Sequence, residues 1–363
     1  MRSLKLVSVP FLAIFAHTLH AHHGSVTNPL LYQSDLLELE GEIVEVFWRN
    51  PHTRAKLRVV DESGAESDWE LEFGPNPRRL ENMGLAAHHL LGTVRVAGHV
   101  SRINPQSLGL LHILMPDGRE FVQGAGRETR WSDDRLYEQP ERIDPERAAA
   151  EAIEADGIFR AWDTHSGPWF AGALPRVEYT ERGAELVAAY EPLTDNRQLH
   201  CEHGMPDAMF DPRPMGIFRE GEDIRIQLVQ YDIQRLIHIG EPDPNPEPSN
   251  VGYSVGRWDG DTLLVTTTHV DWPYYSDYGT PQSDQARYDE TFRVVEEDGE
   301  PELHYSITIS DPVVFPEPLH FETTRAPLPG YDFRPYNCTA EWEDFAQSEA
   351  ATVTINVIRG GDQ

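Results

Sequence analysis

The feature that most constrains the fold is a succession of short segments in which apolar and polar residues alternate. Alternation with period two is typical of strands that bury one face, and short turns join antiparallel neighbours. We therefore predict a mainly antiparallel sheet of about eight strands that curls into a barrel, with an open sheet or a sandwich as the alternative. The segments follow Pro214 and span residues 215–219, 223–230, 232–240, 252–258, 262–269, 286–296, 302–310 and 318–325.

The first part of the chain shows the same periodicity with one helical interruption. A long first strand changes the parity of its alternation beside Gly41, as at a bulge or bend. Two strands follow it, Asn76 then opens a short helix, and two more strands span residues 93–100 and 108–115. This order indicates a five-stranded barrel of the oligonucleotide/oligosaccharide-binding (OB) type, so the predicted class is all-β: an OB-like barrel followed by a larger barrel-like domain.

The composition changes along the chain predict four parts and an export signal. Basic Arg2 and Lys5 precede a short apolar run, and Ala21 ends a cleavage site. No later run reaches about 18 apolar residues, so we expect no transmembrane segment and a periplasmic or secreted protein. The predicted parts are a signal peptide at 1–21, the OB-like barrel at 22–122, a charged, partly helical linker at 123–155 and the larger β domain at 156–363.

The charge balance restricts the partners. The chain has 30 Lys plus Arg against 61 Asp plus Glu, a formal net charge of -31. Nucleic acids and anionic membranes attract cationic surfaces, so we expect neither as a partner. A small-molecule ligand is the expected partner, and the sequence specifies no oligomeric state.

The two cysteines, Cys201 and Cys338, are expected to form a disulfide, because an exported protein meets an oxidising compartment. Closing so long a loop is worth roughly 4–5 kcal/mol in the chain-entropy model. The alternative is a metal cluster in which both thiolates join His200, Glu202 and His203, although this spacing matches no standard zinc pattern.

Two sets of motifs resemble uncharacterised families. The segment from Gly41 to His52 reads G-E-I-V-E-V-F-W-R-N-P-H and follows a His-His-Gly-Ser start. It resembles a family of exported bacterial proteins with a His-His-Ser start and a G-x-V-x-x-V-x-W-x-N-P-H core. The second half, with C-x-x-G-M-P at Cys201–Pro206 and G-R-W-D-G-D-T-L at Gly256–Leu263, resembles a companion module. Neither resemblance implies an activity.

Four polar residues of the predicted barrel are the candidate catalytic groups. His238 could transfer protons with Glu290 or Asp311 as its partner acid, and Arg235 could hold an enolate or a carboxylate. Arg235 and His238 have opposite parity on one strand, so only a bulge would bring them together. Because motifs for nucleotides, serine hydrolysis or zinc proteolysis are missing, we expect no cofactor and, if there is turnover, a lyase or isomerase. Structural ion pairs within the barrel are the alternative.

Aromatic residues are the candidate ligand-binding groups, because their rings suit hydrophobic or aromatic molecules. Several lie in a long loop, residues 270–281, where they could cover a ligand or simply close the barrel end. The set comprises Trp258, Tyr231, Tyr288, Trp272 and Tyr278.

The leading hypothesis is therefore an exported protein with a small-molecule site in its C-terminal domain, with or without turnover. A second hypothesis is a periplasmic metal-binding protein, because the amine and ring of a processed His22 could chelate copper together with His23 and His52. A third is a scaffold without catalytic activity.

Overall fold

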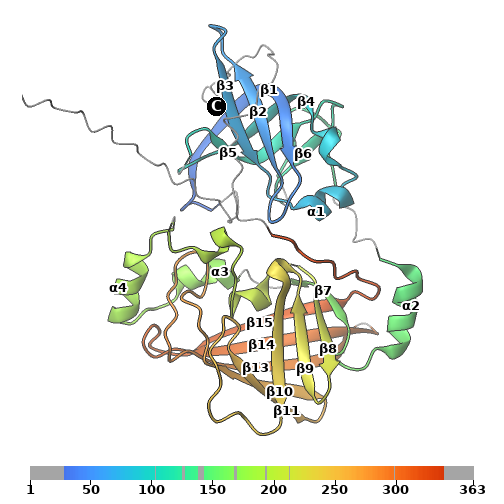
Figure 1. Cartoon of the computed structure of the whole chain (residues 1–363), viewed down its shortest axis with the longest axis vertical. Helices are drawn as coiled ribbons and strands as arrows, with labels where there is room; N and C mark the ends of the chain where they lie inside the picture. Colours follow the sequence, from blue (N-terminus) through green and yellow to red (C-terminus); the bar gives the residue numbers. More distant parts are fainter. Residues whose placement is uncertain are drawn as a thin grey trace, which may run out of the picture.

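The chain folds into two β-barrels that follow one another along the sequence (Figure 1). The computed structural model describes residues 28–338, apart from 103, 125–126, 138–142, 167–169, 193, 212 and 298. His22, His23 and the predicted signal peptide lie outside these residues. The predicted all-β class is confirmed: an antiparallel sheet forms a ring of five strands, and a closed nine-stranded barrel follows it.

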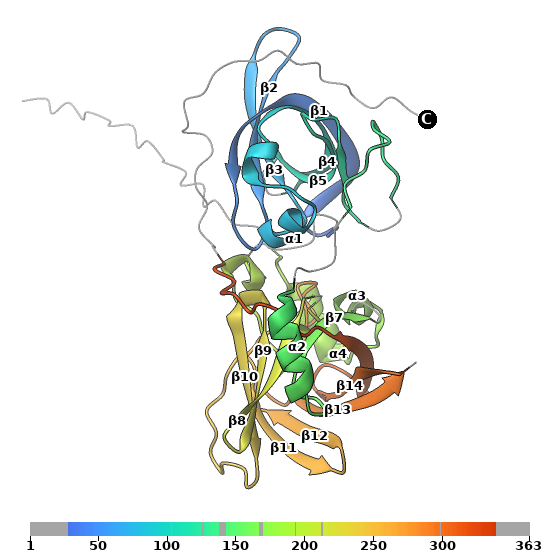
Figure 2. The same ribbon diagram turned by 90° about the vertical axis from the view of Figure 1, so that its right-hand side faces the viewer.

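The first barrel contains the predicted order of three strands, a helix and two strands. Its sheet has the order β3-β2-β1-β4-β5-β6, and β3 also pairs in parallel with β5, which closes a ring of five strands (Figure 2). Helix α1 (Pro77–Asn82) and the 3-10 helix η1 (Ala87–His89) follow β3, and β6 is an additional strand. The strands are β1 (Tyr32–Phe47), β2 (Arg54–Val60), β3 (Glu66–Glu72), β4 (Gly92–Ser101), β5 (Ser107–Leu114) and β6 (Glu120–Val122).

The predicted bend lies in β1. The register of β1 on β2 shifts between Ile43 and Glu45, close to Gly41. A Cβ atom on Gly41 would lie 2.5 Å from the carbonyl oxygen of Arg58, so a larger residue would push the two strands apart. Glycine is therefore required where β1 crosses β2.

The second barrel has nine strands in the order β10-β11-β12-β13-β14-β15-β7-β8-β9, closed by the pairing of β9 with β10. Strands β10 and β11 pair in parallel, and the other neighbours are antiparallel. The strands are β7 (Ala161–Ser166), β8 (Met215–Glu220), β9 (Asp223–Leu228), β10 (Ile233–Ile239), β11 (Tyr253–Asp259), β12 (Thr262–Thr268), β13 (Arg287–Glu297), β14 (Glu300–Ser310) and β15 (Leu319–Pro327).

The prediction of about eight strands covered β8 to β15 and omitted β7. Strand β7 is short and lies in a segment whose glycines and prolines predicted irregular structure. Its Trp162 is fully buried in the core. Buried Arg325 of β15 holds this region together, because its guanidinium donates to the carbonyl oxygens of Asp163, Met209, Asp211 and Arg213 at 2.8–3.2 Å.

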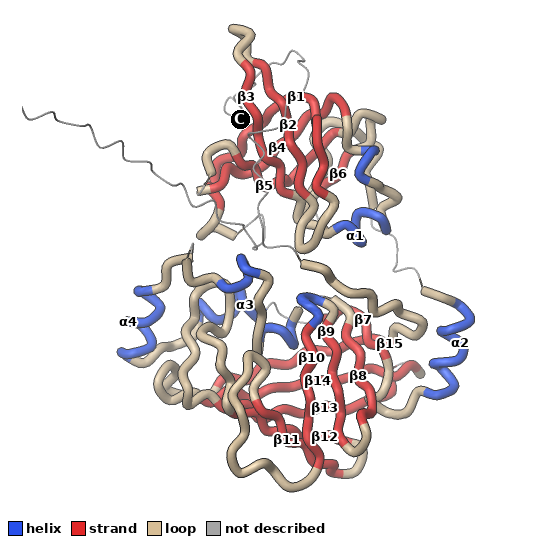
Figure 3. Tube along the Cα trace, in the orientation of Figure 1, coloured by secondary structure: helices blue, strands red, loops and turns tan. Residues whose placement is uncertain are grey.

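The helices lie at the periphery of the second barrel (Figure 3). Helix α2 falls within the predicted linker, and α4 begins after Thr180, whose side chain accepts a hydrogen bond from Gly183 N, as its sequence predicts. No helix of the described residues is long and apolar enough to cross a bilayer. The helices are α2 (Pro145–Glu154), α3 (Phe170–Ala173), α4 (Glu181–Ala189) and the 3-10 turns η2 (Leu174–Arg176), η3 (Arg197–His200), η4 (Asp207–Phe210) and η5 (Gln230–Asp232).

The chain after β15, residues 328–338, which we call the tail, runs between the two barrels (Figure 1). It ends at Cys338, which is bonded to Cys201 with a Cα–Cα distance of 5.9 Å. The predicted disulfide is confirmed, and the alternative with metal-bound thiolates is wrong, because both sulfur atoms are in the bond. On the side of the first barrel, Arg78 lies over the ring of Tyr331 at 4.4 Å and donates to Asp332 O at 3.0 Å.

We predict that the double variant Cys201→Ser/Cys338→Ser unfolds with a free energy lower by roughly 4–5 kcal/mol, because the bond closes a loop across 137 positions. Guanidinium unfolding followed by tryptophan fluorescence measures this change. Reduction of the unmodified protein should reproduce it. A loss below about 1 kcal/mol in both experiments would show that the bond contributes little to stability.

Candidate functional site

A buried ion pair joins five strands inside the second barrel. Arg235 of β10 and Glu290 of β13 make two hydrogen bonds, 2.8 Å from Nη1 to Oε2 and 2.5 Å from Nη2 to Oε1. The hydroxyls of Ser254 on β11 and Thr267 on β12 accept from Arg235, and Tyr305 on β14 donates to Glu290 at 2.9 Å. Each guanidinium nitrogen and carboxylate oxygen thus has a partner. Burial disfavours the charged form of Arg235 and by itself would lower its pKa. The Glu290 carboxylate outweighs this effect, so the pKa of Arg235 is raised.

The other two predicted catalytic residues lie elsewhere. Asp311, after β14, accepts hydrogen bonds from Tyr275 Oη at 3.0 Å and from Ser283 Oγ at 2.7 Å. His238 lies on the opposite face of β10 from Arg235, with its Nδ1 3.0 Å from Asp223 Oδ2. The β10 pairings show no bulge, so the opposite parity of Arg235 and His238 keeps them apart.

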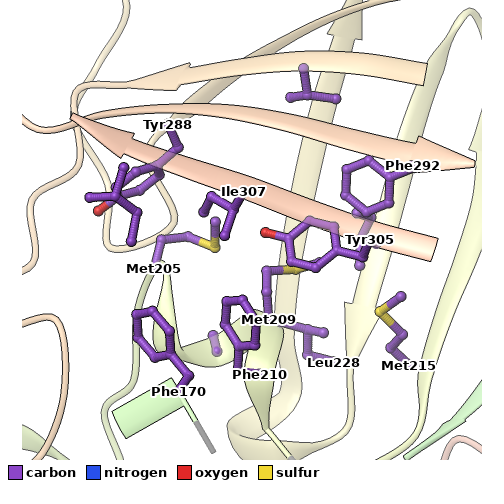
Figure 4. Packing of buried hydrophobic residues seen from close by; sticks show 14 of the residues in the cluster. Phe170, Met205, Met209, Phe210, Met215, Leu228, Tyr288, Phe292, Tyr305 and Ile307 are labelled. Carbon is purple, nitrogen blue, oxygen red and sulfur yellow. The ribbon is translucent and has the colours of Figure 1, made fainter. Parts of the chain in front are cut away.

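The centre of the barrel is packed with side chains. The C-x-x-G-M-P turn and η4 send Met205, Met209 and Phe210 into it, beside Tyr288 and Tyr305 (Figure 4). These residues are at most 4% exposed. Methionine fills irregular spaces well, which suits a segment that closes the barrel from one end.

The five predicted ligand-binding aromatic residues lie in different surroundings. Tyr288 is fully buried and donates to Gln282. Tyr231 packs against other rings, Trp272 is 7% exposed and Tyr278 is half-buried in the long loop. Only Trp258 among these five is largely exposed, at 41%.

A groove of about 460 Å³ lies on the outside of the second barrel, where α2, β8 and the tail meet; we call it the α2 groove. Its volume is within the range of about 300–1,000 Å³ that is typical of small-molecule sites. The residues that line it are Arg147, Glu151, Glu154, Ala155, Asp156, Phe159, Arg160, Ala161, Ile217, Phe218, Arg219, Tyr331, Asp332 and Phe333.

Aromatic rings form the apolar walls of the α2 groove. Phe333 packs edge-on against Phe218 and Tyr331, with ring centroids 5.7 and 4.8 Å apart. Phe159 contacts the predicted ligand-binding residue Trp258 at 6.0 Å. Gly216 of β8 makes room for these rings, since a Cβ atom there would lie 2.3 Å from Phe218 and 2.8 Å from Phe333.

Helix α2 and the tail hold each other in place. Asp144 caps the helix, because its Oδ1 accepts from the amides of Glu146 and Arg147. Gly330 N donates to Glu151 Oε2 at 2.6 Å. A Cβ on Gly330, whose φ is +81°, would lie 2.7 Å from Asp144 O, so only glycine allows this close approach.

Three arginines line the α2 groove, and two of them have carboxylate partners. Arg147 is 3.6 Å from Asp332, and Arg219 pairs with Asp156. Arg160 donates to Gly157 O at 3.2 Å, but no described carboxylate lies within 4.0 Å of its guanidinium. Burial lowers the pKa of Arg160. It is therefore the cation of the groove whose charge is least compensated.

This groove could hardly be predicted from the sequence. Its rings Phe159, Phe218 and Phe333 are single aromatic residues in segments far apart along the chain. The Asp144-Pro145 pair is a helix-start signal that would have placed α2. No local pattern in the sequence predicts that the tail packs against α2.

A much smaller crevice, of about 10 Å³, lies between η3, η4 and the long loop; we call it the Asp207 crevice. Asp207, which is 15% exposed, and Asp277 both line it. Burial raises the pKa of Asp277 to about 6 and that of Asp207 well above its usual value. Beside them burial lowers the pKa of His203 to about 4, and its Nε2 is 4.0 Å from Asp207 Oδ2.

Of the predicted metal ligands, the structure describes His52 alone. Its Nδ1 is 2.6 Å from Glu72 Oε1. A carboxylate on one ring nitrogen is the arrangement that orients a metal-binding histidine. A group that sequence reasoning did not single out, Glu297, Glu302 and His304 at the β13–β14 hairpin, also has ligand atoms within 4.8 Å of one another.

Comparison with known proteins shows that part of the chain is similar to a protein family. Residues 11–114 match a family of unknown function, DUF6152, which spans most of the first barrel. No curated protein matches the chain. The family assigns no activity, and the resemblance of the second half to a companion module stays a prediction.

We predict that Glu290→Ala lowers the free energy of unfolding by about 3–5 kcal/mol, because it leaves the Arg235 charge buried without a charged partner. Urea unfolding measures this loss. Asp289→Ala on the same strand is the matched control: it breaks a pair with Arg287 that is about half exposed, and should cost at most about 1 kcal/mol. Equal losses for the two variants would contradict the central role of the buried pair.

We predict that Asp277→Asn changes how stability depends on pH. The pKa of Asp277 is about 6 in the folded chain and 3.8 in the unfolded chain, so only the unfolded chain is ionised between these values. The Asp277 carboxyl therefore costs the wild type about 2–3 kcal/mol as pH rises from 4 to 6, so the stability of Asp277→Asn should rise by that amount relative to the wild type over this range. Urea unfolding at a series of pH values measures the difference.

His203→Gln is the control with the opposite sign. The pKa of His203 falls from 6.5 to about 4 on folding, so the unfolded chain takes up the proton first. The His203 ring therefore costs the wild type stability as pH falls through this window, so His203→Gln should gain stability relative to the wild type as pH falls. Identical pH profiles for wild type and both variants would show that neither group is perturbed.

Proposed function

We propose that this protein binds a small amphipathic molecule with an anionic group, and that the α2 groove is the site. The observation that carries the proposal is the combination, in one groove of ligand size, of aromatic walls with the guanidinium of Arg160, which has no described carboxylate within 4.0 Å. The hypothesis of a hydrophobic or aromatic ligand in the C-terminal domain is thus kept, and its site moves from the barrel interior to the outside.

The aromatic rings and Arg160 contribute to ligand binding in different ways. Burying a ligand ring against Phe159, Phe218 and Phe333 supplies the non-directional part of the affinity, about 25 cal/mol for each Å² of apolar surface. Arg160 supplies orientation, because a guanidinium can donate two hydrogen bonds to one carboxylate, sulfonate or phosphate. Arg147 and Arg219 offset the charges of Asp332 and Asp156, two of the four acids that line the groove.

We further propose that the protein is exported to the periplasm or secreted, on the basis of the basic and apolar pattern of residues 1–21. A disulfide suits such a compartment. A second candidate function is metal binding by His52 with His22 and His23, and the contact between His52 and Glu72 favours it.

The fluorescent anion 1-anilinonaphthalene-8-sulfonate tests the α2 groove. We expect it to bind the wild type with one site, to be displaced by dodecanoate, and to bind Arg160→Gln about tenfold more weakly, since a hydrogen bond to a charged group is lost. The neutral dye 1-aminoanthracene should bind wild type and Arg160→Gln equally. Fluorescence titration measures all the dissociation constants.

Two variants control this experiment. Gly216→Ala pushes Phe218 and Phe333 into the groove and should weaken both dyes. Arg287→Gln removes an exposed arginine from another strand and should change neither. Unchanged affinity of the anionic dye for both Arg160→Gln and Gly216→Ala would exclude the groove as its site.

A further inference from the structure

The Asp207 crevice contains a buried hydrogen-bond donor without a partner. Asn196 is 3% exposed, and its Oδ1 accepts from Gln198 N at 3.0 Å to cap η3. Its Nδ2 faces no acceptor within the part of the chain that the structure describes. Buried donors are almost always paired, so this amide is arranged to meet an acceptor from outside the protein.

The same crevice presents acceptors with spare capacity. Asp207 Oδ2 accepts one hydrogen bond from Gln198 Nε2, and Asp277 Oδ2 accepts one from Asn28 Nδ2 of the first barrel, both at 3.3 Å. A carboxyl group, ionised or protonated, can accept more than one hydrogen bond. In the described residues no Lys or Arg nitrogen lies within 4.0 Å of either carboxyl group. The arginine that lines the crevice, Arg197, pairs with Glu202 instead.

Aromatic side chains complete the lining. Tyr190 and Tyr274 pack edge-on with their ring centroids 4.9 Å apart, and Trp272 lies under the guanidinium of Arg197 at 5.7 Å. Such rings offer apolar surface to C–H groups beside the polar atoms. The crevice volume of about 10 Å³ admits one group the size of a water molecule.

These features select one kind of chemical group. An ammonium group only donates hydrogen bonds, so it would face the Asn196 amide, which is also a donor, and the positive charge of Arg197. A carboxylate only accepts, and its negative charge would lie between two carboxyl groups that have no Lys or Arg nitrogen within 4.0 Å among the described residues. A hydroxyl group does both: it accepts from Asn196 Nδ2 and donates to a carboxyl oxygen.

We propose that the Asp207 crevice is a second binding site, which takes a hydroxyl group of a neutral polyol of the sugar class. One hydroxyl enters between Asn196 and the two carboxyl groups, and the ring of the sugar lies at the mouth beside the aromatic side chains. This site is separate from the α2 groove, and none of the residues lining the groove lines it.

Saturation-transfer NMR with D-glucose and glycerol tests the proposal on the full-length protein. The informative variant is Asn196→Asp, because aspartate keeps the oxygen that caps η3 and replaces the donor with an acceptor. Asn104→Asp is the matched control: its Oδ1 accepts from Gln106 N in an exposed turn, and Asn104 does not line the crevice. Asp207→Asn is a second variant, in case Asn196→Asp alters the fold.

We expect transfer to glucose in the wild type and in Asn104→Asp, and a weakening of affinity by at least about fivefold in Asn196→Asp, as for loss of one hydrogen bond. Asp207→Asn should weaken binding as well, while Arg160→Gln in the α2 groove should not change it. The absence of transfer to either polyol in the wild type would overturn the proposal. So would unchanged binding in both crevice variants.

Discussion

The buried pair of Arg235 and Glu290 is the interaction on which the second barrel depends. Taking two charges out of water is costly, and the cost is offset only when every remaining donor and acceptor is satisfied. Here the partners come from five successive strands, β10 to β14. A shift of β13 by one residue would move Glu290 to the outer face and leave the guanidinium alone. The pair therefore specifies the register of half the barrel.

Because that pair and the Met205–Phe210 segment occupy the interior, space for ligands lies where peripheral elements meet the barrel. The α2 groove forms where the tail returns to a helix more than a hundred residues earlier in the chain, and Cys338 fixes the end of the same tail. The Asp207 crevice forms where the turn after Cys201 meets the long loop. Both places depend on contacts between segments that are distant in sequence, so neither belongs to a single motif.

How far the sequence predicts this molecule depends on the range of the interaction. Alternation located the strands β8 to β15, and two cysteines in a chain expected to be exported predicted their bond. Strand β7 was not predicted, because it is short and because much of its pairing is with β15, about 160 residues away. Parity correctly separated Arg235 from His238, yet parity cannot show that Glu290, and not Asp311, is the partner of Arg235. The aromatic walls of the groove come from isolated residues, which carry no periodic signal.

The ninth strand has a consequence for topology. Going round a ring of antiparallel strands, the direction alternates up and down, so such a ring can close only with an even count. Both barrels here have odd counts, five and nine, and each accordingly contains one parallel seam, β3 against β5 and β10 against β11. Because β7 makes the count of strands odd, β10 and β11 run in the same direction, and the chain must return along the length of the barrel between them. The acidic, proline-containing stretch from Glu241 to Pro248 lies in this connection.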